Sequence, residues 1–206
     1  CYLLVAVPSG GVAQNLVPNP GFEDTTHCDN YLPPYEEALY WYSPNSATPD
    51  IWDTDTSDPC GSFMDSTDQG IQMIGYSPAF EGQRFAGAYQ WKGPGGSNAR
   101  DYFQIELLSE LEAGKAYRVA LYCARPKGFR RAIDHIGVYF SLDSVFLNAF
   151  TTLPYVPQAQ LHDPNTAYLI DTNWVQLADT FVAAGSERWL IFGTFLPASM
   201  AFRSAT

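Results

Sequence analysis

The feature that most constrains the fold is a series of short segments in which apolar and polar residues alternate and which end at turns. They span residues 84–91, 101–108, 116–124, 133–141, 173–182 and 188–195. Gly- and Pro-containing stretches separate several of them, as at 93–96 and 112–115. A period of two residues is typical of a strand with one buried face, and no segment sustains the 3.6-residue period of a helix. The sequence therefore predicts an all-β protein with strands spaced as in a sandwich.

The N-terminal third has a different character. Residues 24–83 are loop-rich and contain many X-Pro pairs, which push the preceding residue away from helical conformation. No Ser/Thr-Pro linker and no internal repeat divides the chain. We therefore expect one domain over residues 14–206.

Charge and hydropathy exclude some partners. The 206 residues carry 22 acidic and 11 basic side chains, a net charge of −11. The only dense basic spot is Lys127, Arg130 and Arg131, so nucleic acid is not an expected partner. No stretch reaches the roughly 20 apolar residues of a membrane span.

The first 13 residues have the pattern of a secretory signal remnant. An apolar run at 2–7 is followed by Pro8-Ser9-Gly10-Gly11 and then by small residues before Gln14. This predicts cleavage near Ala13 and a secreted or cell-surface location, extracellular or associated with the outer membrane. An ordinary apolar first strand and a lipid-anchored Cys1 are the alternatives.

The four cysteines fit an exported protein. Cys28 and Cys60 both lie in polar loops, and we expect them to form a disulfide. Cys123 lies in an alternating strand and is expected to be a buried free thiol. No CxxC motif or zinc-type spacing is present.

One face of the predicted sheet is partly polar. Alternation places Val119, Leu121 and their neighbours on a core side, and leaves Tyr, Gln, Arg and His on the reverse side. Sugar rings stack on flat aromatic rings, and amides and acids bind their hydroxyl groups. The candidate glycan-binding residues are Tyr89, Trp91, Tyr102, Gln104, Tyr122 and Tyr139. The alternative is that these rings belong to the core.

Several motifs occur in a fairly specific order. The chain has NLVPNPGFE at 15–23, WYSP at 41–44, AGAY at 86–89, a Tyr- and Leu-rich stretch from Tyr102 to Tyr117, and IDHIGVYF at 133–140. In this order they resemble the N-terminal galactose-binding-like jelly-roll domain of exported Bacteroidetes surface proteins, which is similar to carbohydrate-binding modules. The resemblance covers roughly residues 14–196.

The resemblance implies several further expectations. NLVPNPGFE would be the first strand of a jelly-roll β-sandwich, and Glu23 would be a ligand of a structural Ca²⁺. The closing strand of the family is not found before Thr206. We therefore expect a sandwich that lacks its last strand and associates through an open sheet edge.

The expected function is non-catalytic binding of a polysaccharide or cell-surface glycan by one module of a larger surface or secreted protein. A structural or adhesive domain without a sugar site is one alternative. A small glycan-acting hydrolase is another, with Glu106 as the candidate carboxylate. No GxSxG or HExxH motif supports other hydrolytic chemistry.

The disulfide expectation is directly testable. Reduction of a Cys28–Cys60 bridge removes a constraint on the unfolded chain and should lower the free energy of unfolding by about 2–4 kcal/mol. Chemical denaturation with and without reductant measures this. An unchanged midpoint would rule out the pairing.

Overall fold

The computed structural model describes residues 3–6, 14–25, 38–54, 78–91, 98–126, 131–195 and 202–204. All regular structure in these residues is β, and they contain no helix. The strands are β1 (Leu3–Ala6), β2 (Trp41–Tyr42), β3 (Asp50–Asp53), β4 (Arg84–Gly87), β5 (Phe103–Glu106), β6 (Ala116–Cys123), β7 (Arg131–Ile133), β8 (His135–Ser141), β9 (Ala159–His162), β10 (Val175–Val182), β11 (Trp189–Gly193) and β12 (Phe202–Ser204).

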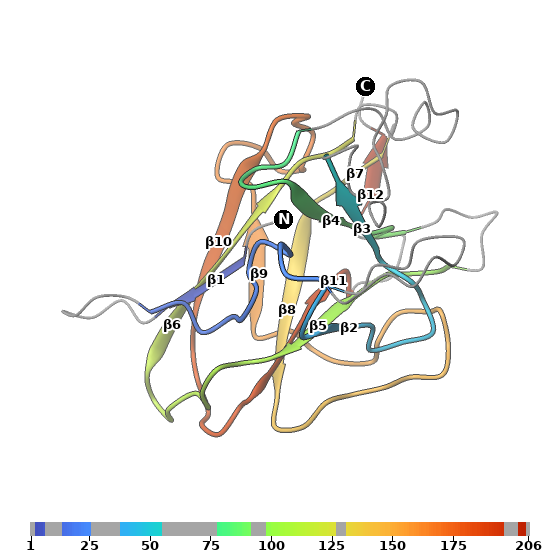
Figure 1. Cartoon of the computed structure of the whole chain (residues 1–206). Helices are drawn as coiled ribbons and strands as arrows, with labels where there is room; N and C mark the ends of the chain where they lie inside the picture. The colour runs from blue at the N-terminus through green and yellow to red at the C-terminus, as the bar shows by residue number, and fades with distance from the viewer. Residues whose placement is uncertain are drawn as a thin grey trace.

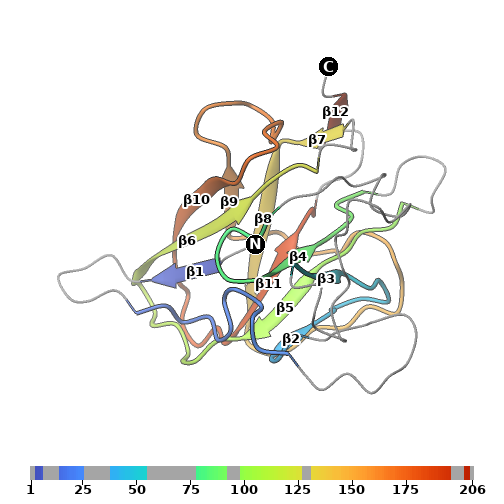
Figure 2. The ribbon, with the colours of Figure 1, turned by 45° about the horizontal axis from the view of Figure 1, so that its top comes forward.

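Most strands belong to one curved antiparallel sheet (Figures 1 and 2). Its eight strands lie in the order β1-β6-β10-β9-β8-β11-β5-β2. The pairs β3–β4 and β7–β12 form two separate two-stranded sheets. The all-β prediction is confirmed, whereas this strand order does not by itself identify a jelly roll.

Every segment with strong alternation contains a strand. The predicted strand at 133–141 divides at Asp134 into β7 and β8. The short strands that were not predicted include β2 and β3 in the Pro-rich third, β9 in a Pro-containing connection and β12 near the C-terminus, where no further strand was expected. With two to four residues, they are too short to show a period.

The stretch NLVPNPGFE does not form the expected first strand. It folds as an irregular segment with positive φ at Asn19 (45°) and Phe22 (65°). The Asn19 Nδ2 donates to the carbonyl oxygens of Asp24 (2.7 Å) and Leu39 (3.1 Å). Pro18 and Pro20 have no N–H for a ladder, so the side chain of Asn19 organises this segment in place of strand pairing.

Part of the predicted signal remnant lies in the sheet. Leu3–Ala6 forms β1 and pairs with β6 from Leu3–Leu121 to Ala6–Arg118. This is the arrangement expected if the stretch is an ordinary first strand. Cleavage after Ala13 stays a prediction.

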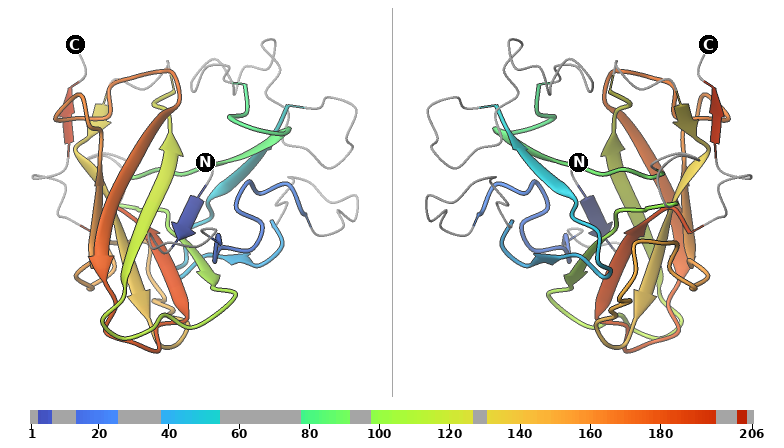
Figure 3. Two further views of the ribbon diagram at one scale, coloured as in Figure 1. Left: turned by 90° about the vertical axis from the view of Figure 1, so that its left-hand side faces the viewer. Right: turned by 90° about the vertical axis from the view of Figure 1, so that its right-hand side faces the viewer.

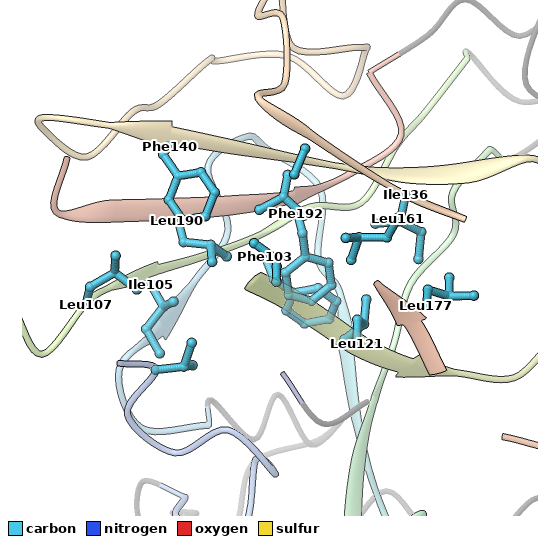
Figure 4. Packing of buried hydrophobic residues seen from close by; sticks show 14 of the residues in the cluster. Phe103, Ile105, Leu107, Leu121, Ile136, Phe140, Leu161, Leu177, Leu190 and Phe192 are labelled. Atoms are coloured by element: carbon cyan, nitrogen blue, oxygen red, sulfur yellow. The ribbon is translucent and has the colours of Figure 1, made fainter. Parts of the chain in front are cut away.

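The inner face of the sheet holds the main core (Figure 4). Val119, Leu121, Val138 and Phe140 are almost completely buried, which confirms the predicted core sides of segments 116–124 and 133–141. Residues 14–25, called here the N-terminal segment, and the two-stranded β3–β4 sheet lie opposite this face (Figure 3). Their buried residues Leu16, Val17, Phe22, Ile51 and Ala86 join the same cluster.

The outer face of β5, β8 and β11 is covered by residues 142–158, called here the covering loop. Leu153 of this loop packs with Tyr102 and Ile191 in a second hydrophobic cluster. The Tyr102 hydroxyl donates to the Thr194 carbonyl (2.6 Å) and accepts from the Leu153 N–H (3.2 Å). The covering loop is therefore fixed to the sheet by buried hydrogen bonds.

These bonds predict the effect of removing one hydroxyl. Tyr102→Phe leaves the Leu153 N–H buried without its acceptor and should lower the free energy of unfolding by about 1–3 kcal/mol. Urea unfolding measures the change, with Tyr40→Phe as a control because Tyr40 is about half exposed. Equal effects of the two substitutions would contradict the role of the Tyr102 hydroxyl.

Candidate functional site: an aromatic hollow beside β2

Two exposed tyrosines flank a buried tryptophan at the β2 edge of the main sheet. Trp41 is 6% exposed and packs on Phe22 with ring centroids 4.7 Å apart. Its indole N–H donates to the Asn19 carbonyl (2.9 Å). Tyr42 follows Trp41 in β2, so it points to the other side, and it is 55% exposed. Tyr40 lies in the turn before β2 with φ 74° and is 51% exposed.

The two tyrosines border a surface hollow of about 280 Å³. The other lining residues are Pro18, Glu106, Leu107 and Leu108. The Leu108 N–H donates to the Leu16 carbonyl (2.9 Å), which ties the N-terminal segment to the end of β5. The irregular NLVPNPGFE segment thus supplies one wall of the hollow through Pro18.

Charged groups lie beside the rings. Arg188 Nη2 is 2.5 Å from Glu106 Oε1, and Arg188 Nη1 is 3.9 Å from Glu110 Oε1. Glu106 and Arg188 are each nearly half exposed, so this pair adds little to stability. The half-buried Trp189 lies across from Glu106 in the β11–β5 register, and its ring centroid is 6.2 Å from that of Tyr42.

This arrangement combines flat apolar surfaces with exposed hydrogen-bonding groups. Aromatic rings offer contact area at small entropic cost, and their faces suit the C–H groups of a sugar. The Glu106 carboxylate lines the hollow and can accept hydrogen bonds, and its ion-pair partner Arg188 is a donor. The hollow can therefore hold a small ring-shaped ligand that has both C–H and hydroxyl groups.

Tyr102 and Gln104 do not reach the surface. Tyr102 is 0% exposed, and Gln104 is 4% exposed with its Oε1 accepting from the Val145 N–H (2.7 Å). Both hold the covering loop, although they lie on the face predicted to be polar.

The other predicted glycan residues are half-buried and lie in separate places. Tyr139 stacks on Tyr155 of the covering loop at 4.7 Å. Tyr122 stacks on Phe80 at 3.8 Å and accepts a hydrogen bond from Gln176. Tyr89 and Trp91 follow β4, and burial, with the nearby Asp50 and Asp101, raises the pKa of Tyr89. None of the six lines the hollow.

The sequence does not predict the aromatic residues of the hollow, Tyr40 and Tyr42, and of its lining only Glu106 is a candidate residue, as a carboxylate. The available signal for Tyr42 is its place next to Trp41, because neighbouring residues of a strand point to opposite faces. That signal requires β2 to be recognised as a strand, and β2 has only two residues. Tyr40 has no such signal, since it lies in a turn with φ 74°.

Glu23 does not have the surroundings of a calcium ligand. Its carboxylate accepts from the N–H groups of Gln83 (3.0 Å) and Arg84 (2.9 Å), and Arg84 Nη1 donates to the Glu23 carbonyl (3.0 Å). Gly82 has φ +65°, and a Cβ there would collide with this carboxylate. Ca²⁺ needs about six to eight oxygen ligands with free lone pairs, so this set of N–H donors and a guanidinium does not fit it.

The remaining candidates for metal or thiol chemistry are the His, Cys, Asp and Glu side chains of the described residues. The described residues contain no group of three or more His, Cys, Asp or Glu side chains placed to hold a metal ion. His135 of β8 is 5% exposed, and its ring lies 5.2 Å from that of His162 across the strand pair. Cys123 is a buried free thiol, as predicted, and burial raises its pKa to about 12. Cys28 and Cys60 lie outside the described residues.

No helix in the described part of the chain is long and apolar enough to cross a membrane.

The environment of Glu23 gives a testable prediction. Glu23→Gln weakens the charge-assisted bonds to Gln83 and Arg84 and should cost about 1–2 kcal/mol of stability. Addition of Ca²⁺ or a chelator should leave the melting temperature of the unsubstituted protein unchanged. A rise in melting temperature with Ca²⁺ that Glu23→Gln abolishes would instead establish Glu23 as a ligand.

No protein-family model, no curated protein and no solved structure matches this chain. Its function is therefore inferred from the geometry of its own site.

Proposed function

We propose that this chain is a non-catalytic glycan-binding module of an exported surface or secreted protein. The observation that carries the proposal is the pair of exposed rings, Tyr40 and Tyr42, at the rim of a hollow that also contains Glu106. Exposed aromatic rings that flank a concave surface with polar groups at its rim are typical of a small-ligand site. A pyranose ring has the size and the mixed C–H and hydroxyl character for this hollow.

The proposed fold family is the galactose-binding-like jelly roll of exported Bacteroidetes surface proteins. The order of the motifs from NLVPNPGFE to IDHIGVYF supports it. The observed architecture is compatible with this fold family. The two-stranded β3–β4 sheet and the N-terminal segment lie opposite the inner face of the antiparallel main sheet. Export and a cell-surface location are parts of the same proposal.

Charge favours a neutral glycan. Glu106 lines the hollow, its ion-pair partner Arg188 lies near a second carboxylate, Glu110, and the whole chain has a net charge of −11. Like charges in this region disfavour uronic acids and sulfated sugars. Neutral hexose polymers are therefore the expected ligands.

A structural or adhesive role is the second candidate. The covering loop exposes large apolar side chains: Leu142 (58%), Phe146 (69%), Phe150 (55%) and Val156 (84%). Exposed apolar groups of this kind often mark contacts with other proteins. This role would not require the hollow.

Substitution in the hollow tests the glycan proposal. Tyr42→Ala removes one exposed ring and should weaken binding to a neutral polysaccharide about tenfold, which corresponds to about 1.4 kcal/mol. Glu106→Gln should weaken it less, because an amide still accepts a hydrogen bond. Affinity electrophoresis against a panel of neutral and acidic polysaccharides provides the measurement.

Phe146→Ala is the matched control, because Phe146 is an exposed ring outside the lining of the hollow. It should leave glycan retention unchanged. If no polysaccharide retains the protein, the glycan proposal is excluded. If Tyr42→Ala and Phe146→Ala reduce retention equally, the hollow is not the glycan-binding surface.

A further inference from the structure

The two sides of β6 are paired to different extents. On one side β10 pairs with the whole strand, from Val175–Cys123 to Val182–Ala116. On the other side β1 pairs only with residues 118–121. Among the described residues, the four residues of β1 therefore pair with only half of the eight-residue edge of β6.

The covered part of β6 is apolar. Val119, Ala120 and Leu121 are each at most 1% exposed. Their register partners in β1 are Val5, Leu4 and Leu3. Only Arg118, the partner of Ala6, is charged. This edge selects an extended segment without charges, because a charge placed beside fully buried Val and Leu would lose its hydration.

β1 lies at the end of the sheet next to β6 (Figures 1 and 3). It is separated in sequence from the next described segment, which begins at Gln14, by a stretch containing Pro8, Gly10 and Gly11. A terminal strand of this kind is one that another chain can replace, because backbone pairing does not depend on covalent connection. Cleavage after Ala13, as the sequence predicts, would remove this strand entirely.

We propose that the outer edge of β6 is a strand-acceptor site that binds an extended, uncharged apolar segment of another protein chain, antiparallel to residues 118–121. β1 fills this site within the uncut chain and defines the register of the incoming strand. Main-chain hydrogen bonds supply the affinity, and the apolar neighbours of β6 supply the selectivity. The site is at the opposite end of the sheet from the aromatic hollow beside β2, so it is independent of glycan binding.

The test keeps the chain intact during folding. A protease recognition sequence is inserted between Gly11 and Val12 of the full chain, and the folded protein is then cut. The probe is a fluorescent peptide of residues 1–11 with Cys1→Ser. We expect saturable binding of the probe to the cut protein and at least tenfold weaker binding to the uncut protein, whose own segment competes at high effective concentration.

Hydrogen exchange locates the bound strand. Successive N–H groups of β6 point alternately to β1 and to β10, so only every second amide of residues 118–121 faces β1. These amides should exchange at least tenfold faster after the segment is washed out, and the probe should restore their protection, whereas the amides that face β10 should stay protected. A probe with Leu4→Pro and Val5→Pro lacks the backbone N–H groups of residues 4 and 5, so it cannot form the full strand pairing and should not bind. Deletion of 202–206, which removes β12 from the separate β7–β12 sheet, should not create probe binding in the uncut protein.

The outcomes separate clearly. Absence of probe binding together with unchanged exchange at 118–121 after loss of the segment would overturn the proposal. If the cut protein precipitates, the uncut variant with Leu4→Pro and Val5→Pro takes its place. Rescue of its melting temperature by the probe supports the site, and failure to rescue it excludes the site.

Discussion

Burial of both faces of β5, β8 and β11 is the constraint on which the rest of the structure depends. The inner face packs against the N-terminal segment, where Phe22 contacts Trp41 and Phe103. The outer face is sealed by the covering loop, which the Tyr102 hydroxyl and the Gln104 amide attach to the sheet. The loop N–H groups of Val145 and Leu153 donate to these side chains, so neither is an unsatisfied donor, which would destabilise the fold. The buried polar side chains of Tyr102 and Gln104 therefore hold the covering loop to the sheet.

The covering loop determines which aromatic rings of the sheet are exposed to a ligand. A ring on the outer face of the central strands is covered by the loop, as Tyr139 is covered by Tyr155. Exposed rings lie at the β2 edge, where Tyr40 and Tyr42 line the hollow together with Glu106, the register partner of Trp189. There the carboxylate and the guanidinium are still near solvent, so both can exchange water for ligand hydroxyls. The aromatic hollow is thus a consequence of where the covering loop ends.

The sequence predicted the strands and the core better than the site. Alternation in residues 116–124 and 133–141 identified Val119, Leu121, Val138 and Phe140 as core residues, because period two requires only local sterics and one buried face. The same alternation assigned Gln104 and Tyr102 to a polar face, but it contains no information about a loop that folds back from 142–158 to bury them. NLVPNPGFE shows the same limit: its apolar residues Leu16 and Val17 do enter the core, yet the contacts of Asn19 and the two prolines decide that the segment turns. Both errors arise from contacts between residues distant in sequence.

The two ends of the main sheet present different chemistry for the same physical reason. An antiparallel sheet that does not close leaves two edges, and each must be made unattractive to nonspecific pairing. At one end β2 has only two residues, so it offers little backbone for another strand and exposes side chains instead. At the other end β6 has eight residues, of which β1 covers four with uncharged, apolar sequence. The short edge therefore favours recognition through side chains, and the long edge favours recognition through backbone. A protein with this sheet can bind a glycan at one end and a protein segment at the other without the two sites sharing a residue.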